Sequence, residues 1–131
     1  MQNMSGGKSA LGLDGNVTAL IGYLIGIVAL ILIFIEKDNK FVRFHAIQAV
    51  LWSVFCTIGI IVVAIVGIIL GLVVSAVSTN LAGIVWILTI LLYVGLIFGL
   101  LGGLIFGAIK AYGNSLFKLP VVGNFAEKWS S

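Results

Sequence analysis

Hydrophobic residues fall into three long blocks along the chain, and polar residues gather between them. The blocks cover residues 17–35, 44–77 and 81–109. Each is close to, or longer than, the ~20 apolar residues that a helix needs to span a bilayer. The pattern therefore predicts an all-α, polytopic membrane helical bundle with three transmembrane helices in a single domain, residues 17–128.

The two later blocks are longer than one membrane crossing requires. At ~1.5 Å per residue, residues 44–77 and 81–109 would each form a helix of roughly 43–50 Å, whereas the hydrocarbon core is about 30 Å thick. Such helices must tilt, bend or extend beyond the membrane. Two or four spans would result if one long block were re-entrant or split.

Charged residues are rare and segregated. They make up 8% of the chain, against 62% hydrophobic residues, and none occurs between Arg43 and Lys110. A soluble domain is about 25% charged. The net charge is +3, but most of the basic residues flank the apolar blocks, as topology signals do, instead of forming a stripe that follows phosphates. We therefore expect no nucleic-acid partner.

The distribution of Lys and Arg predicts the orientation in the membrane. Residues 36–43 carry three basic residues, the segment after residue 109 carries three, and residues 78–80 carry none. Basic loops stay in the cytoplasm. With three spans, we expect a multi-pass cell-membrane protein with its N-terminus outside and its C-terminus cytoplasmic.

The segments outside the apolar blocks have their own signals. Residues 1–16 are polar and contain glycine, which predicts a flexible tail. In the charged loop, Asp38 or Asn39 can cap the following helix by accepting a bond from a free backbone N–H. The C-terminal segment, residues 115–128, is expected to lie at the membrane interface, with Asn124 and Glu127 resembling a capping box for a last short helix.

Glycines recur at four-residue spacing in all three blocks, a pattern of the glycine-zipper kind. Small residues at this spacing let helix backbones approach closely inside a bilayer, where lipid is as apolar as leucine. The pattern leaves two interpretations open: packing of helices within one monomer, or the seam of a homo-oligomer. The candidate packing residues are Gly22, Gly26, Gly67, Gly71, Gly95, Gly99, Gly103 and Gly107.

The densest polar motif is Arg43, His45 and Gln48, where the second block begins. In a structural role, Arg43 would reach the headgroups while His45 and Gln48 hydrogen-bond another helix or the C-terminal segment. In a functional role, the last two would line a small polar cavity or a lipid-headgroup site. A catalytic histidine is the third interpretation, although no acid or nucleophile is near it in sequence. Tyr23 is expected to be a packing or interface residue.

The sequence offers no further group for chemistry. The four carboxylates lie outside the apolar blocks, and Cys56 is the single cysteine. No metal-ligand spacing, cofactor motif or catalytic constellation is present, so we expect no enzyme, no cofactor and no metal. An ion-coupled transporter would keep an ionisable group at membrane depth, and only His45 comes near that condition.

Two motifs resemble a known family. Residues 35–48, IEKDNKFVRFHAIQ, and residues 110–128, with FKLPVVGNFAEK, are similar to a family of small bacterial and archaeal membrane proteins of unknown function that is grouped with the Tic20-like proteins. The resemblance implies a compact helical membrane domain with both motifs on one side. The predicted topology also puts both motifs on the cytoplasmic face, so we expect the C-terminal segment to fold back beneath the bundle and contact Arg43, His45 or Gln48.

Assembly is the function that this pattern favours. We expect a non-enzymatic membrane protein that acts as an assembly, accessory or translocon-like component, with the lipid bilayer and a homo-oligomer or a larger membrane complex as its partners. The alternative is a small homo-oligomeric channel or passive carrier, lined by the glycine faces and by His45 and Gln48. A membrane enzyme acting on lipid would lack visible catalytic groups.

Overall fold

The chain is almost entirely helical in a computed structural model that describes residues 7–131. The expected all-α class is confirmed. The chain divides into two compact units: unit 1 comprises the described residues through Val54 and from Gly102 onward, and unit 2 comprises Phe55–Leu101. The helices are α1 (Gly15–Leu24), α2 (Gly26–Ile35), α3 (Lys40–Ser75), α4 (Thr79–Tyr112) and α5 (Val122–Ser130).

Two helices, α3 and α4, are long and apolar enough to cross a membrane. They contain 36 and 34 residues, with mean hydropathies of 3.1 and 2.7 over their most apolar stretches. At ~1.5 Å per residue each is roughly 50 Å long. Helix α3 begins before the second block, at Lys40, and contains all of it except Ala76 and Val77; α4 contains the third block and extends beyond it to Tyr112. The polar break between them is short, since α4 begins at Thr79.

The first apolar block does not form the single helix expected over residues 17–35. It is divided at Ile25 into α1 and α2, which have ten residues each. A ten-residue helix is roughly 15 Å long, about half of the hydrocarbon thickness. The described residues therefore contain two candidate spans in place of the three expected.

The break at Ile25 leaves its backbone groups bonded. Ile25 has an extended conformation, with φ −124° and ψ 96°. Its N–H donates to the carbonyl of Ile21 at 2.8 Å, and its carbonyl accepts from Val28 at 3.0 Å. Gly22 has no side chain, so Ala29 packs closely against it. The chain can thus reverse direction at Ile25 while the N–H and carbonyl of this residue stay hydrogen-bonded. Unpaired backbone groups would be costly in lipid.

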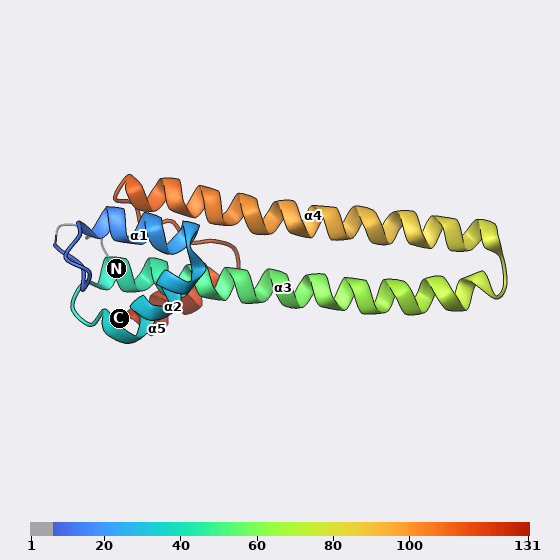
Figure 1. The fold of residues 1–131 in the computed structure, drawn as a ribbon, viewed down its shortest axis with the longest axis horizontal. Coiled ribbons are helices and arrows are strands. Elements are labelled where there is room, and N and C mark those ends of the chain that lie inside the picture. The colour runs from blue at the N-terminus through green and yellow to red at the C-terminus, as the bar shows by residue number, and fades with distance from the viewer. Residues whose placement is uncertain (1–6) are drawn as a thin grey trace. The chain divides into compact units, whose positions relative to one another are not determined.

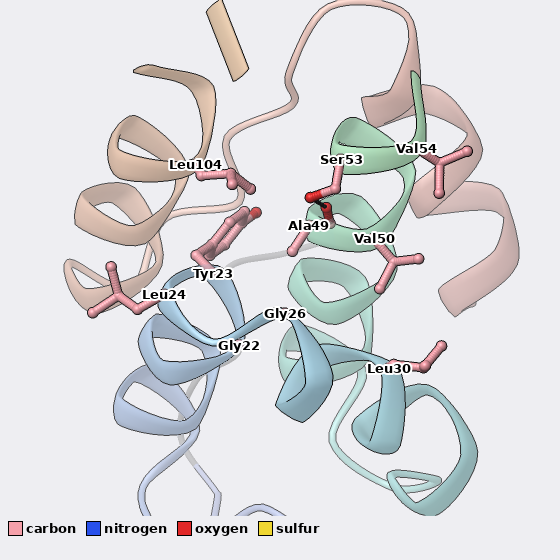
Figure 2. A pocket seen from close by; sticks show the side chains of 10 residues that line it. All are labelled: Gly22, Tyr23, Leu24, Gly26, Leu30, Ala49, Val50, Ser53, Val54 and Leu104. Atoms are coloured by element: carbon pink, nitrogen blue, oxygen red, sulfur yellow. Dashed lines mark hydrogen bonds between the residues drawn. The ribbon is translucent and has the colours of Figure 1, made fainter. Parts of the chain in front are cut away.

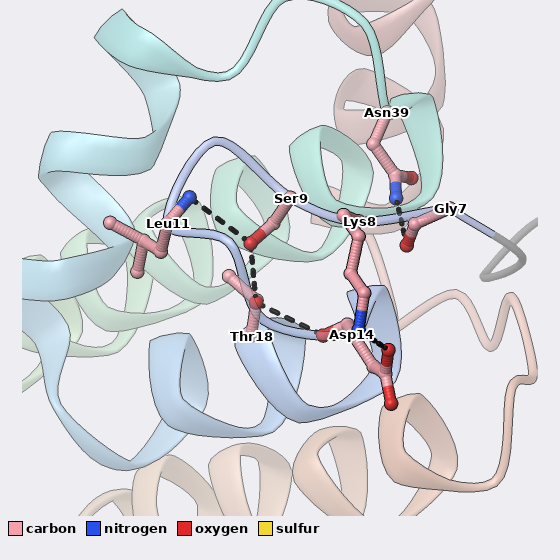
Figure 3. Close-up of polar contacts among 7 residues, drawn as sticks. All are labelled: Gly7, Lys8, Ser9, Leu11, Asp14, Thr18 and Asn39. Carbon is pink, nitrogen blue, oxygen red and sulfur yellow. Dashed lines mark hydrogen bonds and ion pairs between the residues drawn. The ribbon is translucent and has the colours of Figure 1, made fainter.

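The segment before α1 is held in place, in contrast to the flexible tail expected over residues 1–16. Lys8 forms an ion pair with Asp14 at 2.6 Å, and the hydroxyls of Ser9 and Thr18 are hydrogen-bonded at 2.6 Å (Figure 3). Ser9 and Thr18 are buried. From residue 7 onward this segment is hydrogen-bonded to α1 and to Asn39, and residues 1–6 of the expected flexible tail lie outside the described part of the chain.

Glu36 joins this N-terminal segment to the loop between α2 and α3. The Glu36 carboxylate accepts hydrogen bonds from the backbone N–H of Ala10 at 2.6 Å and of Asn39 at 3.1 Å. Asn39 also donates its side-chain amide to the carbonyl of Gly7, a contact drawn in Figure 3. The start of α1 and the end of α2 therefore lie together, so α1 and α2 form a hairpin that returns to the end where it began (Figure 1).

Asn39 is also the cap expected for the second block. Its side-chain oxygen accepts the N–H of Val42 at 3.3 Å, three residues on, at the start of α3. This satisfies one of the free N–H groups of the first turn. The capping box expected at Asn124 and Glu127 is absent, because Asn124 lies inside α5 and Val121 precedes the helix without a side-chain cap.

The two units are packed differently. In unit 2 the closest contacts are glycines against side chains, with Gly67 beside Thr89 and Gly71 beside Trp86. Most other side chains of unit 2 are exposed, and none of the residues in the most apolar stretch of α4 is buried. In unit 1, by contrast, α1, α2 and α5 gather around the first turns of α3 (Figure 1). A core of large and small apolar side chains fills the space between them.

Candidate functional site: a buried polar cluster

The polar residues predicted at the start of α3 lie in the interior of unit 1. His45 and Gln48 have exposed fractions of 0%, and Tyr23 of α1 has 2%. The Tyr23 hydroxyl lies 2.7 Å from Nδ1 of His45 and 2.8 Å from Nε2 of Gln48. We call these three side chains the polar cluster. Their spacing on α3 puts both polar residues on the face towards α1.

The polar cluster holds the chain segment that follows α4. His45 Nε2 lies 2.9 Å from the carbonyl of Ser115, and Gln48 Nε2 donates to the carbonyl of Phe117 at 2.9 Å. The N–H of Leu119 donates to Gln48 Oε1 at 2.8 Å. The expected contact between the C-terminal segment and the motif of Arg43, His45 and Gln48 is therefore present, through His45 and Gln48.

One arrangement of protons satisfies every member of the polar cluster. The carbonyl of Ser115 can only accept, so Nε2 of His45 carries the proton and Nδ1 accepts from the Tyr23 hydroxyl. The hydroxyl oxygen in turn accepts from Gln48, whose second amide hydrogen goes to Phe117. The Leu119 N–H fixes which way the Gln48 amide points. The donor and acceptor roles in each hydrogen bond therefore follow from those in the neighbouring bond, and the bonds strengthen one another.

Aromatic rings enclose the imidazole of His45. Phe41, Phe44 and Tyr23 meet it edge-on, with ring centroids 4.6, 4.9 and 5.4 Å away. Among the described residues, no buried side-chain nitrogen or oxygen lacks a hydrogen-bond partner. An unpaired polar group here would cost about 1–3 kcal/mol. The geometry fits the structural interpretation of His45 and Gln48 better than a ligand site.

Arg43 lies beside the polar cluster and has a separate role. Its guanidinium Nη1 donates to the carbonyls of Ile33 at 2.7 Å and of Glu36 at 3.1 Å. These carbonyls are at the C-terminal end of α2, where backbone acceptors are free and the helix dipole favours a cation. Arg43 therefore caps α2 instead of reaching towards headgroups.

A cavity of about 520 Å³ adjoins the polar cluster at the turn between α1 and α2 (Figure 2). Tyr23 is the one member of the cluster on its wall, and Ser53 supplies a further hydroxyl, which donates to the carbonyl of Ala49. His45 and Gln48 do not line it. The remaining lining is apolar: Gly22, Leu24, Gly26, Leu30, Ala49, Val50, Val54 and Leu104. No group of three or more metal-ligating side chains occurs among the described residues.

The candidate packing glycines differ in their surroundings. A Cβ would clash with Tyr23 at Gly107 and with Trp52 at Gly103, as it would at Gly67 and Gly71 in unit 2. These glycines permit close contacts within one chain, and Gly22 permits an ordinary van der Waals contact. The candidates with no neighbouring atom within 4 Å are Gly26, Gly95 and Gly99.

Sequence reasoning missed two members of this region. Tyr23 was expected to be a packing or interface residue, and its hydroxyl is the centre of the polar cluster. A tyrosine inside an apolar block needs a partner for its hydroxyl, which was the signal available. Glu36 was taken as part of a charged loop, and it is 2% exposed.

The chain is similar to membrane proteins of archaea. A family described as the magnetosome magnetite crystal formation protein family matches residues 10–126. Two UPF0132 membrane proteins of Methanocaldococcus jannaschii are 34% and 32% identical, over 95% and 92% of this chain and 96% and 73% of their own lengths. A UPF0132 membrane protein of Archaeoglobus fulgidus is 30% identical over 86% of this chain and 92% of its own length. No solved structure matches.

These matches revise the resemblance drawn from the two motifs. They support a small archaeal and bacterial membrane family, but not the Tic20-like grouping inferred from residues 35–48 and 110–128. The relatives are named membrane proteins, and α3 and α4 are long and apolar enough to span a bilayer. The chain is therefore a membrane protein.

Proposed function

Because this chain belongs to the magnetosome magnetite crystal formation protein family, whose archaeal relatives are described only as membrane proteins, we propose a role that rests on its structure: it is a non-enzymatic membrane component that acts by assembly. Unit 2 contributes helix faces to a homo-oligomer or a larger membrane complex. Unit 1 anchors these helices at one membrane surface.

The observation that carries this proposal is the open glycine face of α4. Gly95 and Gly99 are exposed and have no neighbouring atom within 4 Å. They are four residues apart, so they lie on one side of the helix. Helices associate in lipid where small residues allow backbone contact, and no atom of the described residues lies within 4 Å of a Cβ placed at either glycine.

The polar cluster favours assembly over the channel or carrier alternative. A pore lined by His45 and Gln48 would need their polar atoms to face water. Both side chains are fully buried, and their hydrogen-bonding atoms are engaged by Tyr23 and by the backbone of the C-terminal segment. Opening them to a pore would break the contacts that hold that segment.

The topology that goes with this proposal has two spans and both described ends on one side. The Asn16 side chain donates to the carbonyl of Tyr112 at the end of α4, and Gly7 contacts Asn39 before α3. The segment from residue 7 thus lies where α3 begins and α4 ends. In this proposal the shared side is cytoplasmic, because basic segments stay in the cytoplasm, whereas three spans would give an external N-terminus.

A size measurement with a matched pair of variants tests the proposal. Gly99→Ile places a bulky side chain on the open face, whereas Gly83→Ile places the same side chain at another glycine without neighbours, roughly 160° away around the helix. We expect the parent protein to be oligomeric in mild detergent, with Gly99→Ile shifted towards monomer and Gly83→Ile unchanged. A parent that is monomeric both in detergent and after cross-linking in its native membrane would refute the proposal.

A further inference from the structure

Helix α5 and the residue that precedes it leave three large apolar side chains exposed. Val121, Phe125 and Trp129 follow one another at four-residue spacing, and their exposed fractions are 59%, 48% and 52%. The rings of Phe125 and Trp129 lie 5.7 Å apart. The other side of α5 is buried, and it carries Val122, Gly123, Ala126 and Ser130. We call the three exposed residues the apolar edge of α5.

The contacts of α5 determine its position along the axis of α3. Ala126 packs in one cluster with Phe44 and Ile47, which are four and seven residues after the start of α3 at Lys40. This is roughly 6–10 Å along the helix axis at ~1.5 Å per residue. Amphipathic helices in the plane of a membrane bury their apolar face about 5–10 Å into the headgroup and acyl boundary. The apolar edge therefore belongs to a helix packed within the first two or three turns of α3, a distance from the start of α3 that is comparable to this burial depth.

The charge around α5 matches an anionic surface. Every charged residue of the chain lies in unit 1, so the whole net charge of +3 is gathered there. Lys8 and Lys118 are paired with Asp14 and Glu127. Three exposed lysines form no ion pair with any described residue: Lys37, Lys40 and Lys128. Lys128 immediately precedes Trp129 and is free for a lipid phosphate.

The turn into α5 is strained where the apolar edge begins. Val121 has φ 67° and ψ −58°, and the N–H of Val122 donates to the carbonyl of Pro120 at 2.7 Å. This is a γ-turn with positive φ, a rare conformation that is unfavourable for a β-branched residue. The Leu119 bond to Gln48 and the packing of Ala126 hold the chain on both sides of the turn. The result is an exposed valine at the residue before α5.

We propose that the apolar edge of α5 is a lipid-binding surface, which inserts into the headgroup region of an anionic membrane on the side where α3 begins. Tryptophan and phenylalanine suit this region, since their rings prefer the boundary between headgroups and acyl chains. The free lysines contact lipid phosphates. Gln48 holds the segment before α5, so the polar cluster sets the depth of the helix.

Depth measurements on the full-length protein in lipid nanodiscs test this surface. In a Cys56→Ala background, Phe125→Cys and Trp129→Cys are spin-labelled one at a time. The control is Asn124→Cys, because Asn124 is exposed on α5 but off the apolar edge. We expect the labels at 125 and 129 to be accessible to oxygen and shielded from a water-soluble nickel reagent, with the reverse at 124.

Two results would overturn the proposal. Equal access of the nickel reagent at all three positions would mean that the apolar edge faces water. Protection of 125 and 129 from both reagents would mean that protein, such as a second copy of the chain, covers it. Because each label is at an exposed position, the size of the particles and the helix content by circular dichroism serve to verify that the variants are folded.

A second measurement tests the preference for anionic lipid. Quenching of a fluorescent label at Phe125→Cys by brominated phosphatidylglycerol, relative to brominated phosphatidylcholine, gives the relative affinity of the two lipids at this site. We expect phosphatidylglycerol to be preferred, and Lys128→Gln to reduce that preference about fivefold. Lys8→Gln, which removes a lysine already paired with Asp14, should leave it unchanged. A ratio near one in the parent would contradict the anionic preference.

Discussion

Unit 1 and unit 2 differ in their polar content and in how far their side chains are buried. Unit 1 contains all the charged residues and a buried polar cluster whose groups are hydrogen-bonded to one another and to the backbone. Unit 2 contains no charged residue, and most of its side chains are exposed. The interior of unit 1 is filled by its own side chains, although its surface also exposes apolar residues such as Phe34 and Trp129. Unit 2 has apolar faces that lipid or other helices must cover.

This difference shows where the fold gets its specificity. Apolar helices in lipid gain little from burying one leucine instead of another, since lipid offers the same contacts. Directional hydrogen bonds between groups shielded from water do distinguish one arrangement from its alternatives. The polar residues of the chain therefore specify unit 1, while in unit 2 the specific contacts are close approaches at glycines such as Gly67 and Gly71.

The largest effect is expected from removing Gln48 from the polar cluster. Gln48→Leu keeps the size of the side chain but leaves the Leu119 N–H and the Phe117 carbonyl without partners. We expect the free energy of unfolding to fall by about 3 kcal/mol, because each orphaned buried group costs about 1–3 kcal/mol. Unfolding by SDS in mixed micelles measures this.

The control lies in unit 2, where Thr89 donates to the carbonyl of Val85 in its own helix. Thr89→Val removes this local bond with almost no change in shape, and we expect a loss of about 0.5 kcal/mol. If Gln48→Leu and Thr89→Val lowered the free energy of unfolding equally, hydrogen bonds would matter no more in unit 1 than in unit 2, against this account.

The next effect comes from the glycine that faces the polar cluster. Gly107→Ala would drive a Cβ into the ring of Tyr23, and overpacking of this kind costs about 1–3 kcal/mol. Gly95→Ala introduces the same methyl group where no atom lies within 4 Å. It should be neutral or slightly stabilising for the isolated chain, because alanine is the better helix former. The same unfolding titration compares the two, and a costly Gly95→Ala in the monomer would show that its face is packed within the chain.

A smaller and more local effect is expected at Glu36. Glu36→Gln replaces one carboxylate oxygen with an amide donor, so a bond to the N–H of Ala10 or of Asn39 is lost. We expect a loss of about 1.5 kcal/mol, the usual value for a bond to a charged group, confined to the segment before α1. Amide hydrogen exchange should speed up at Ala10 and leave the amide of Leu119 protected. Uniform acceleration at both amides would mean that the N-terminal segment and the polar cluster open together.

The smallest effect is expected at the exposed pair of Lys118 and Glu127. The hydrogen bond from Lys118 lowers the pKa of Glu127 below its usual range. The pair therefore stabilises the folded state above the unfolded pKa of glutamate, and this contribution is lost as the pH falls through the lowered pKa. NMR titration of Glu127 should give a midpoint below the usual ~4.3, and Lys118→Gln should raise it. An unchanged midpoint in that variant would remove Lys118 as the cause.

Local patterns in the sequence predicted much of this fold. The hydropathy of the second and third blocks predicted α3 and α4, and the Asn39 cap followed from residue type and position. The break of the first block could not be predicted in this way, because residues 17–35 have the length and composition of a span. The two helices of this block are instead held by tertiary contacts: Tyr23 is hydrogen-bonded to His45, and Arg43 caps the end of α2.

The candidate site was predictable in its location but not in its partners. Arg43, His45 and Gln48 were the densest polar motif, and the contact with the C-terminal segment was expected. The bond between Gln48 and Leu119 joins residues 71 positions apart, and no local pattern specifies such a pair. The open state of Gly99, in contrast to the packed Gly103, depends on the rotation of α4, which four-residue spacing leaves undetermined.

Disulfide cross-linking in the native membrane tests most directly whether unit 2 is completed by other helices. In a Cys56→Ala background, cysteine is placed in turn at Gly95, Gly99 and Gly83, and the membranes are treated with a mild oxidant. The account predicts cross-linked species for Gly95→Cys and Gly99→Cys and none for Gly83→Cys. Absence of cross-links at all three positions, or equal cross-linking at all of them, would contradict a specific assembly face on α4.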